Sequence, residues 1–207
     1  MRASLQAMTL SLLLGPCVTA CDAFNAPDAL SFDRPPTGNE PTTSETGDAG
    51  AGGAEIDTDT ALAPIVDGGF RSGAFTHATH TPYPSSAAPG SFVDEWVSSA
   101  SYAEYSRIQP DAGGSGVVLP PGSIVIRAVV DSNDDVSKLT IMLKGPAGYN
   151  PALGDWWFAA TDPSGNPLED DAGVLAGRLT GCYSCHLPRS GDDFLFGVPL
   201  DDRPPSD

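Results

Sequence analysis

The segment Pro120–Asp131 reads "PPGSIVIRAVVD" and carries the clearest structural signal of the chain. A Pro-Pro-Gly turn leads into seven residues, 124–130, that are mostly β-branched and therefore favour a strand. The acidic stretch 131–135 has the composition of a turn, and a second apolar run, "DDVSKLTIMLKG", follows it. Two such runs joined by a short polar turn predict an antiparallel pair of strands.

Two further strands are expected on either side of this pair. Upstream, residues 92–98 read "FVDEWVS" and precede a short helical stretch, "SASYAEYSRI". Downstream, "GDWWFAATD" is closed by the turn sequence "PSGNP". Regular short strands with few helical periods predict a mainly β (α+β) fold, a single antiparallel β-sheet domain with a few short helices.

The N-terminus has the pattern of an export signal. Residues 1–20 hold Arg2 and an apolar centre, Met8–Leu14, that fits a signal peptide and is too short to span a bilayer. The end of this segment, Val18–Cys21, resembles a bacterial lipobox, which predicts a lipid on Cys21. The alternative is an ordinary signal cut after Ala20. Both predict export, and the lipobox predicts a protein anchored to a membrane in the periplasm or cell envelope.

Residues 21–63 are rich in Pro, Gly, Thr and acids, with nine acidic residues between 22 and 64 against the single Arg34. Such a segment buries too little apolar surface to offset its conformational entropy, so we expect a disordered tether. Residues 64–207 are then expected to form one domain. The net charge of the chain, −17, argues against nucleic acid as a partner and permits docking to a basic redox protein.

The segment 180–193, "TGCYSCHLPRSGDD", holds two cysteines and a histidine within five residues, in a chain that has few cysteines and histidines elsewhere. In an exported chain, Cys182 and Cys185 are expected to be oxidised, metallated or covalently modified. Cys-x-x-Cys-His is the pattern of covalent c-type haem attachment, in which the two thiols bond the porphyrin and His186 binds the iron. We therefore favour one covalent haem c.

Two alternatives remain open. A zinc site formed by Cys182, Cys185, His77 and His80 would make the chain a zinc-stabilised binding module, but it leaves His186 unexplained. A disulfide within Cys-x-x-Cys also leaves that histidine idle, and such disulfides are usually catalytic in a parallel βαβ context that the sequence does not show.

The order of "PPGSIVIRAVV", "LTIMLKGPAGYNP", "GDWWFAATDPSGNP", "CYSCH" and "DDFLFGVP" resembles the cytochrome P460 family, which includes the cytochromes c′-beta. The likeness spans about residues 76–199. It implies a mainly antiparallel β fold, often dimeric, with a c-type haem near the C-terminus. It also implies electron transfer or binding of NO or CO, or alternatively an oxidoreductase that converts hydroxylamine or nitrogen oxides.

The sequence departs from the pattern of this family at one position. The hydroxylamine-oxidising members cross-link a lysine to the porphyrin, and the matching position here is Arg127, whose guanidinium is a poor nucleophile. Lys144 matches a different lysine of the pattern, so no cross-link is expected and the chain is not primarily expected to be an enzyme. Arg127 is instead a candidate to bind a haem propionate or line the distal pocket. Met142 is a candidate sixth ligand, with plain core the favoured interpretation.

Three more expectations concern the surroundings of the haem. Trp156, Trp157 and Phe158 are expected to form core or haem wall. Asp192 and Asp193 are expected in a solvated turn, with a role in orienting the loop after His186 as the alternative.

Overall fold

The apolar run of residues 124–130 forms strand β4 (Ile124–Val130) in the interior of the sheet. The run after the acidic turn forms β5 (Val136–Lys144), which pairs antiparallel to β4 with Ile126 opposite Ile141. The register shifts between the last two residues of β4, as at a β-bulge. The predicted strand pair is confirmed.

The computed structural model describes residues 55–85, 91–110, 114–131, 133 and 135–205. The expected signal peptide, the expected lipidation site Cys21 and most of the expected tether lie outside these residues. Within the described part of the chain, no helix combines the length and hydropathy of a membrane span.

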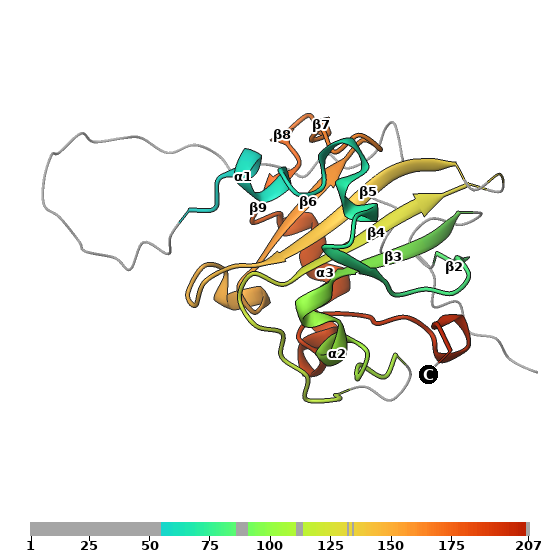
Figure 1. The fold of residues 1–207 in the computed structure, drawn as a ribbon. Coiled ribbons are helices and arrows are strands. Elements are labelled where there is room, and N and C mark those ends of the chain that lie inside the picture. The colour runs from blue at the N-terminus through green and yellow to red at the C-terminus, as the bar shows by residue number, and fades with distance from the viewer. Residues whose placement is uncertain (1–54, 86–90, 111–113, 132, 134, 206–207) are drawn as a thin grey trace, which may run out of the picture.

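All strands of the main sheet are antiparallel, in the order β1-β3-β4-β5-β6-β9, with β2 also paired to β3 (Figure 1). The flanking strands are β1 (Phe75–His77), β2 (Tyr83–Pro84), β3 (Phe92–Ser98), β6 (Trp156–Thr161) and β9 (Ala176–Gly177). A separate hairpin is formed by β7 (Glu169–Asp170) and β8 (Gly173–Val174). The mainly β fold with a few short helices is confirmed at this level.

The helices are all short. The α-helices are α1 (Thr58–Leu62), α2 (Tyr102–Tyr105) and α3 (Tyr183–His186). The 3-10 helices are η2 (Val66–Arg71), η3 (Ser99–Ser101), η4 (Pro151–Leu153), η5 (Thr180–Cys182), η6 (Leu187–Asp192) and η7 (Leu200–Asp202). The helical stretch expected after β3 is thus two short turns, η3 and α2.

Each face of the sheet carries its own apolar cluster, because successive side chains of a strand point to opposite faces. One face, here face A, buries a cluster that includes Val93, Val97, Val125, Met142, Trp156 and Phe158. The other, face B, buries a cluster that includes Ile126, Ala128, Leu139, Ile141, Trp157 and Ala159. Figure 1 shows α2 and α3 on one side of the sheet and α1 on the other. Residues of α2 and α3 pack on face A, and residues of α1 and η2 pack on face B.

Helix α1 moves the boundary of the domain, because it lies within the range expected for the tether. Asp57 caps the helix by accepting a hydrogen bond from the Thr60 N–H at 2.9 Å. The helix then buries Leu62, which is 2% exposed, in the face B cluster. The folded domain therefore begins before residue 64. Composition hid this helix, because its two apolar residues stand within an acidic, Pro-rich stretch.

Replacing Leu62 with Ala should lower the free energy of unfolding by about 2–4 kcal/mol, because a fully buried leucine leaves a cavity when truncated. Urea unfolding followed by tryptophan fluorescence measures this. Leu200→Ala is the matched control, since Leu200 is 57% exposed and its truncation should change stability by less than about 0.5 kcal/mol. Equal effects of the two substitutions would exclude α1 from the cooperative domain.

Candidate functional site

The Cys-x-x-Cys-His segment lies on one continuous helical turn. Helix η5 ends at Cys182, and α3 continues from Tyr183 through Cys185 to His186. Residues three apart on a helix are neighbours on its surface, so the two cysteines share one side of the turn. Both are half-buried, and Cys182 packs against the face A cluster.

His186 is held by a backbone carbonyl. Its Nδ1 lies 2.7 Å from the carbonyl oxygen of Phe194, and because a carbonyl only accepts, Nδ1 carries the proton. Among the described residues no hydrogen bond reaches Nε2, which therefore keeps its lone pair. Burial lowers the pKa of His186, and the charge of Arg127 acts in the same direction. The imidazole is thus neutral near pH 7, the form that binds a metal.

Aromatic rings flank this imidazole. The Phe158 ring of β6 lies 5.4 Å from it, centroid to centroid, and the Phe196 ring lies 5.1 Å away in an edge-on arrangement. Two guanidinium groups approach the same Phe196 ring, Arg127 at 5.9 Å and Arg189 at 5.7 Å. The candidate site therefore combines a neutral imidazole, apolar walls and nearby positive charge.

Arg127 belongs to a buried polar cluster on face A. Its Nε lies 2.9 Å from Oε1 of Glu95, the residue directly opposite it on β3. Its Nη2 donates to the Tyr83 hydroxyl at 2.9 Å. Glu95 is 1% exposed and also accepts hydrogen bonds from the hydroxyls of Tyr83 and Tyr105. Both carboxylate oxygens of Glu95 are therefore occupied.

Burial and neighbouring charges shift the pKa of three members of this cluster, the two tyrosines and Arg127. Burial raises the pKa of Tyr83 and of Tyr105, and the negative charge of Glu95 raises both further. Burial alone would lower the pKa of Arg127, but the charge of Glu95 and the contacts with Tyr83 and Tyr105 together outweigh burial, so the pKa is raised. At neutral pH Arg127 therefore stays a cation and both phenols keep their protons.

The turn after His186 is buried, which corrects the expectation of a solvated turn. Asp192 is 1% exposed and accepts hydrogen bonds from the backbone N–H groups of Gly114 and Ser115. Asp193 is 5% exposed and forms an ion pair with Lys144. Sequence reasoning favoured solvent here because an Asp-Asp pair is usually exposed when no partner is known.

The other predicted residues take different places. Met142 is 7% exposed within the face A cluster, as expected for core. Trp156 and Phe158 share face A with the candidate site, whereas Trp157 packs on face B. Only two of the three expected aromatics are therefore on the site's side of the sheet, because neighbouring strand residues alternate.

The four residues of the zinc alternative are not brought together. His77 pairs through Nε2 with Asp94 and stacks on Trp96 at 4.3 Å, and Trp96 packs against face B. Cys182 packs against face A instead. In residues 55–205, apart from the gaps given above, no three His, Cys, Asp or Glu side chains are grouped to bind a metal ion.

The two cysteines differ in state. Cys182 is a free thiol, and burial raises its pKa to about 11. Cys185 is disulfide-bonded, and its partner is not Cys182. The expected alternative of a disulfide closed within Cys-x-x-Cys is thus not what the structure shows.

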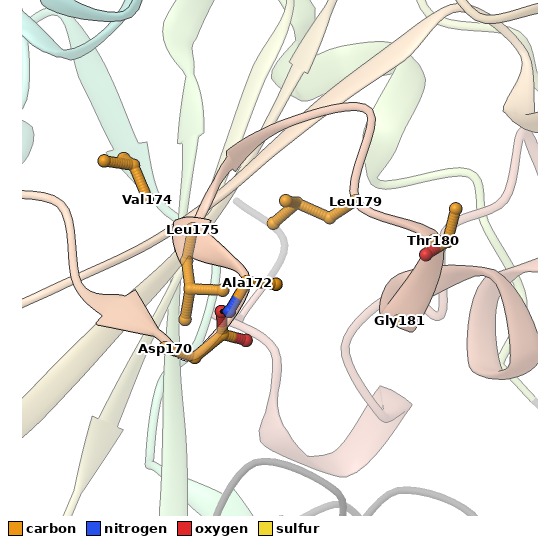
Figure 2. Close-up of a pocket in the computed structure, with 7 residues that line it drawn as sticks. All are labelled: Asp170, Ala172, Val174, Leu175, Leu179, Thr180 and Gly181. Atoms are coloured by element: carbon orange, nitrogen blue, oxygen red, sulfur yellow. Dashed lines mark hydrogen bonds between the residues drawn. The ribbon is translucent and has the colours of Figure 1, made fainter. Parts of the chain in front are cut away.

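A small pocket borders the N-terminal end of η5, as Figure 2 shows. It has a volume of about 170 Å³, below the roughly 300 Å³ at which pockets for drug-sized ligands begin. Its lining residues come from the β7–β8 hairpin and the segment leading to α3: Asp170, Ala172, Val174, Leu175, Leu179, Thr180 and Gly181. The pocket ends at Gly181, next to Cys182 in the chain, and neither the two cysteines nor His186 line it.

Sequence reasoning missed Glu95, its two tyrosine partners and the Phe194 carbonyl. Glu95 had a readable signal, since it stands between Val93 and Val97 at positions that share one face of β3. The Phe194 carbonyl had no signal in the sequence, because every residue type has a backbone carbonyl. Comparison with known proteins found no matching family model, no matching curated protein and no matching solved structure.

Replacing Glu95 with Gln should lower the free energy of unfolding by about 3 kcal/mol, because it leaves the Arg127 cation without its buried counter-charge. Urea unfolding at pH 7 measures the change. Glu104→Gln is the control, since Glu104 pairs with Arg107 at the exposed surface and the loss should stay below about 1 kcal/mol. A Glu95→Gln protein as stable as this control would contradict the role assigned to the ion pair.

The raised pKa of Cys182 predicts an unusual alkylation profile in the chain without haem. A thiolate reacts and a thiol does not, so the rate with iodoacetamide should rise about tenfold per pH unit from pH 8 past pH 10 in the folded protein. In urea the rate should level off near the ordinary thiol pKa of 9.0. Peptide mapping shows which cysteine is alkylated, and the Cys182→Ser variant gives the background without this thiol. A plateau near pH 9 in the folded protein would show that this thiol is not desolvated.

Proposed function

We propose that the chain is an exported mono-haem c-type cytochrome that serves in electron transfer or in binding NO or CO. The observation that carries this proposal is the hydrogen bond from His186 Nδ1 to the Phe194 carbonyl. His186 directly follows Cys185, the second cysteine of the Cys-x-x-Cys pair. That bond directs the proton to Nδ1 and leaves Nε2 as a metal ligand, and haem-binding and other metal-binding histidines are oriented in this way.

The residues that would hold the haem are Cys182 and Cys185 through thioether bonds and His186 through Nε2. When bound, the haem supplies an iron that changes oxidation state and binds diatomic ligands. Attachment at Cys185 requires its sulfur to be a free thiol. We propose that a dithiol reductant of the haem attachment system first exchanges with the disulfide, giving up two electrons and two protons and becoming a disulfide itself.

Phe158 and Phe196 provide an apolar environment around the imidazole, and such an environment would limit the access of water to a metal ligand. Arg127 and Arg189 supply positive charge beside Phe196. Haem carries two propionates, and planar guanidinium groups suit carboxylates. We assign Arg127 to this role, with its Glu95 and Tyr83 contacts fixing the direction of its guanidinium.

The alternative function, oxidation of hydroxylamine or a related nitrogen compound, has less support. It calls for a lysine cross-linked to haem and an available acid or base. The ammonium of Lys144 is paired with Asp193 in the interior. The carboxylate of Glu95 is saturated by Arg127 and two tyrosines. Neither side chain is free for these roles, so we place electron transfer or gas binding first.

The remaining parts of the proposal come from the sequence. A lipid on Cys21 would hold the domain at a membrane of the cell envelope, with residues up to α1 as spacer. The resemblance to the cytochrome P460 family also suggests a homodimer and a small nitrogen-oxide or diatomic ligand. A redox protein with a basic surface would suit the negative charge of the chain.

The test is a pyridine haemochrome spectrum of the chain co-expressed with a c-type haem attachment system. We expect a c-type spectrum with no red-shifted band. Cys182→Ala and Cys185→Ala should each leave one thioether and shift the spectrum, and the double variant should lose all haem to acid acetone. His186→Ala should keep the covalent haem but lose the spectroscopic signature of a histidine nitrogen bound to the iron.

Ser184→Ala is the control, because it alters an exposed residue of α3 without touching a ligand. A red-shifted band would favour the hydroxylamine-converting alternative. A wild-type chain that stays colourless would overturn the haem proposal, and so would covalent haem that persists in the double cysteine variant.

A further inference from the structure

The carbonyl that holds His186 belongs to a strained turn. Asp193 and Phe194 have φ angles of 54° and 64°, in the left-handed region. Aspartate tolerates this region, but a bulky residue such as phenylalanine is rarely found there. Backbone in this state persists only where its surroundings over-determine it, so the contacts of these residues show what the strain maintains.

Asp193 is held from three separate segments. Its Oδ1 accepts a hydrogen bond from Lys144 Nζ of β5, and its Oδ2 accepts from the Leu119 N–H at 2.8 Å. Its carbonyl oxygen accepts from Trp156 Nε1 of β6, also at 2.8 Å. The Lys144 ammonium further lies 4.9 Å from the centre of the Trp156 ring. Asp193 is thus tied to two adjacent strands of the sheet, to β5 through its side chain and to β6 through its backbone carbonyl.

Phe194 is held by a close fit against a glycine. Its N–H donates to the Arg189 carbonyl at 2.8 Å. Its ring lies over Gly154, so close that a Cβ there would stand 2.6 Å from Cε2 and 2.8 Å from Cδ2. No real Cβ approaches a ring carbon so closely. Gly154 is therefore required for space as well as for its own φ of 57°.

We propose that residues 193–194 form a positioning element for His186, in which the Lys144–Asp193 ion pair and the fit of the Phe194 ring on Gly154 set the place of the Phe194 carbonyl. That carbonyl in turn fixes the tautomer and direction of the imidazole. Lys144, Asp193 and Gly154 touch none of the proposed haem ligands in this account and act through Phe194. They are positioning residues for the metal ligand.

The consequence for bound haem rests on the proposed function, whereas the positioning of the imidazole does not. A hydrogen bond from Nδ1 makes the imidazole a more basic ligand. Loss of that bond should weaken the iron–histidine bond and shift the reduction potential upward, because a less basic ligand stabilises the oxidised iron less well.

The decisive variant is Gly154→Ala, which drives a methyl group into the Phe194 ring. Gly148→Ala is its matched control: Gly148 also has a left-handed φ, 84°, but has no atom within 4 Å of the position of a Cβ. Both substitutions place a side chain at a left-handed φ, and only Gly154→Ala brings that side chain against Phe194. Asp193→Asn is the second variant; it keeps the shape of the side chain and weakens the contact with Lys144.

Tautomers are read from ¹H–¹⁵N long-range correlation spectra of the full chain without haem, with the rings of His77 and His80 as internal references. Wild type and Gly148→Ala should show His186 protonated at Nδ1. Gly154→Ala and Asp193→Asn should show a mixture of tautomers. If both variants fold, by circular dichroism, and keep the wild-type His186 pattern, the positioning role is wrong. If Gly154→Ala fails to fold, Asp193→Asn decides alone.

The same four proteins loaded with haem give an independent readout. The iron–histidine stretching band in resonance Raman spectra should move to lower frequency in Gly154→Ala and Asp193→Asn, and the reduction potential should rise. An unchanged band in both variants would contradict the proposed transmission to the iron. A wild-type chain that binds no haem would overturn the proposed function, and the tautomer spectra would still decide the positioning role.

Discussion

The pairing of β3 with β4 sets Glu95 directly opposite Arg127, and the arrangement of face A depends on this register. The two charges occupy positions where their strands otherwise present valines to the core. A slip of one residue would carry Arg127 to face B and leave Glu95 buried without a counter-charge, which costs several kcal/mol. With the charges paired and two tyrosines completing the carboxylate's hydrogen bonds, the face remains a closed surface against which α2 and α3 pack.

A second buried ion pair on the same face, Lys144–Asp193, connects the sheet to a loop and not to a neighbouring strand. Lys144 and Asp193 link β5 to the turn that follows His186, so the sheet holds a segment that has little stability of its own. Helix α3 has four residues, too few to be stable in isolation. Its position therefore comes from tertiary contacts: Cys182 against the face A cluster, His186 between two phenylalanine rings, and the Phe194 carbonyl on Nδ1. The rigidity of the sheet is in this way extended to the proposed ligand.

The three interpretations of the Cys-x-x-Cys-His segment now stand differently. The zinc interpretation loses its geometric basis, because His77 is engaged with Asp94 and Trp96 on the other face of the sheet. The disulfide within the motif is replaced by a free Cys182 and a Cys185 bonded elsewhere. The haem interpretation remains our proposal, and it rests on a neutral His186 protonated at Nδ1, with no hydrogen bond at Nε2 among the described residues.

The strands from 92 to 161, their antiparallel arrangement and the local order of cysteines and histidine could be predicted from the sequence, because they depend on residue type, alternation and near-neighbour spacing. Alternation along residues 124–130 also places Arg127 on one face with Val125 and Val129. The fold was needed to show that Glu95 opposes Arg127, that α1 belongs to the domain, that Asp192 and Asp193 are buried, and that Gly154 makes room for Phe194. Each of these joins residues far apart in the chain, and such contacts depend on strand register and on backbone groups that every residue type possesses.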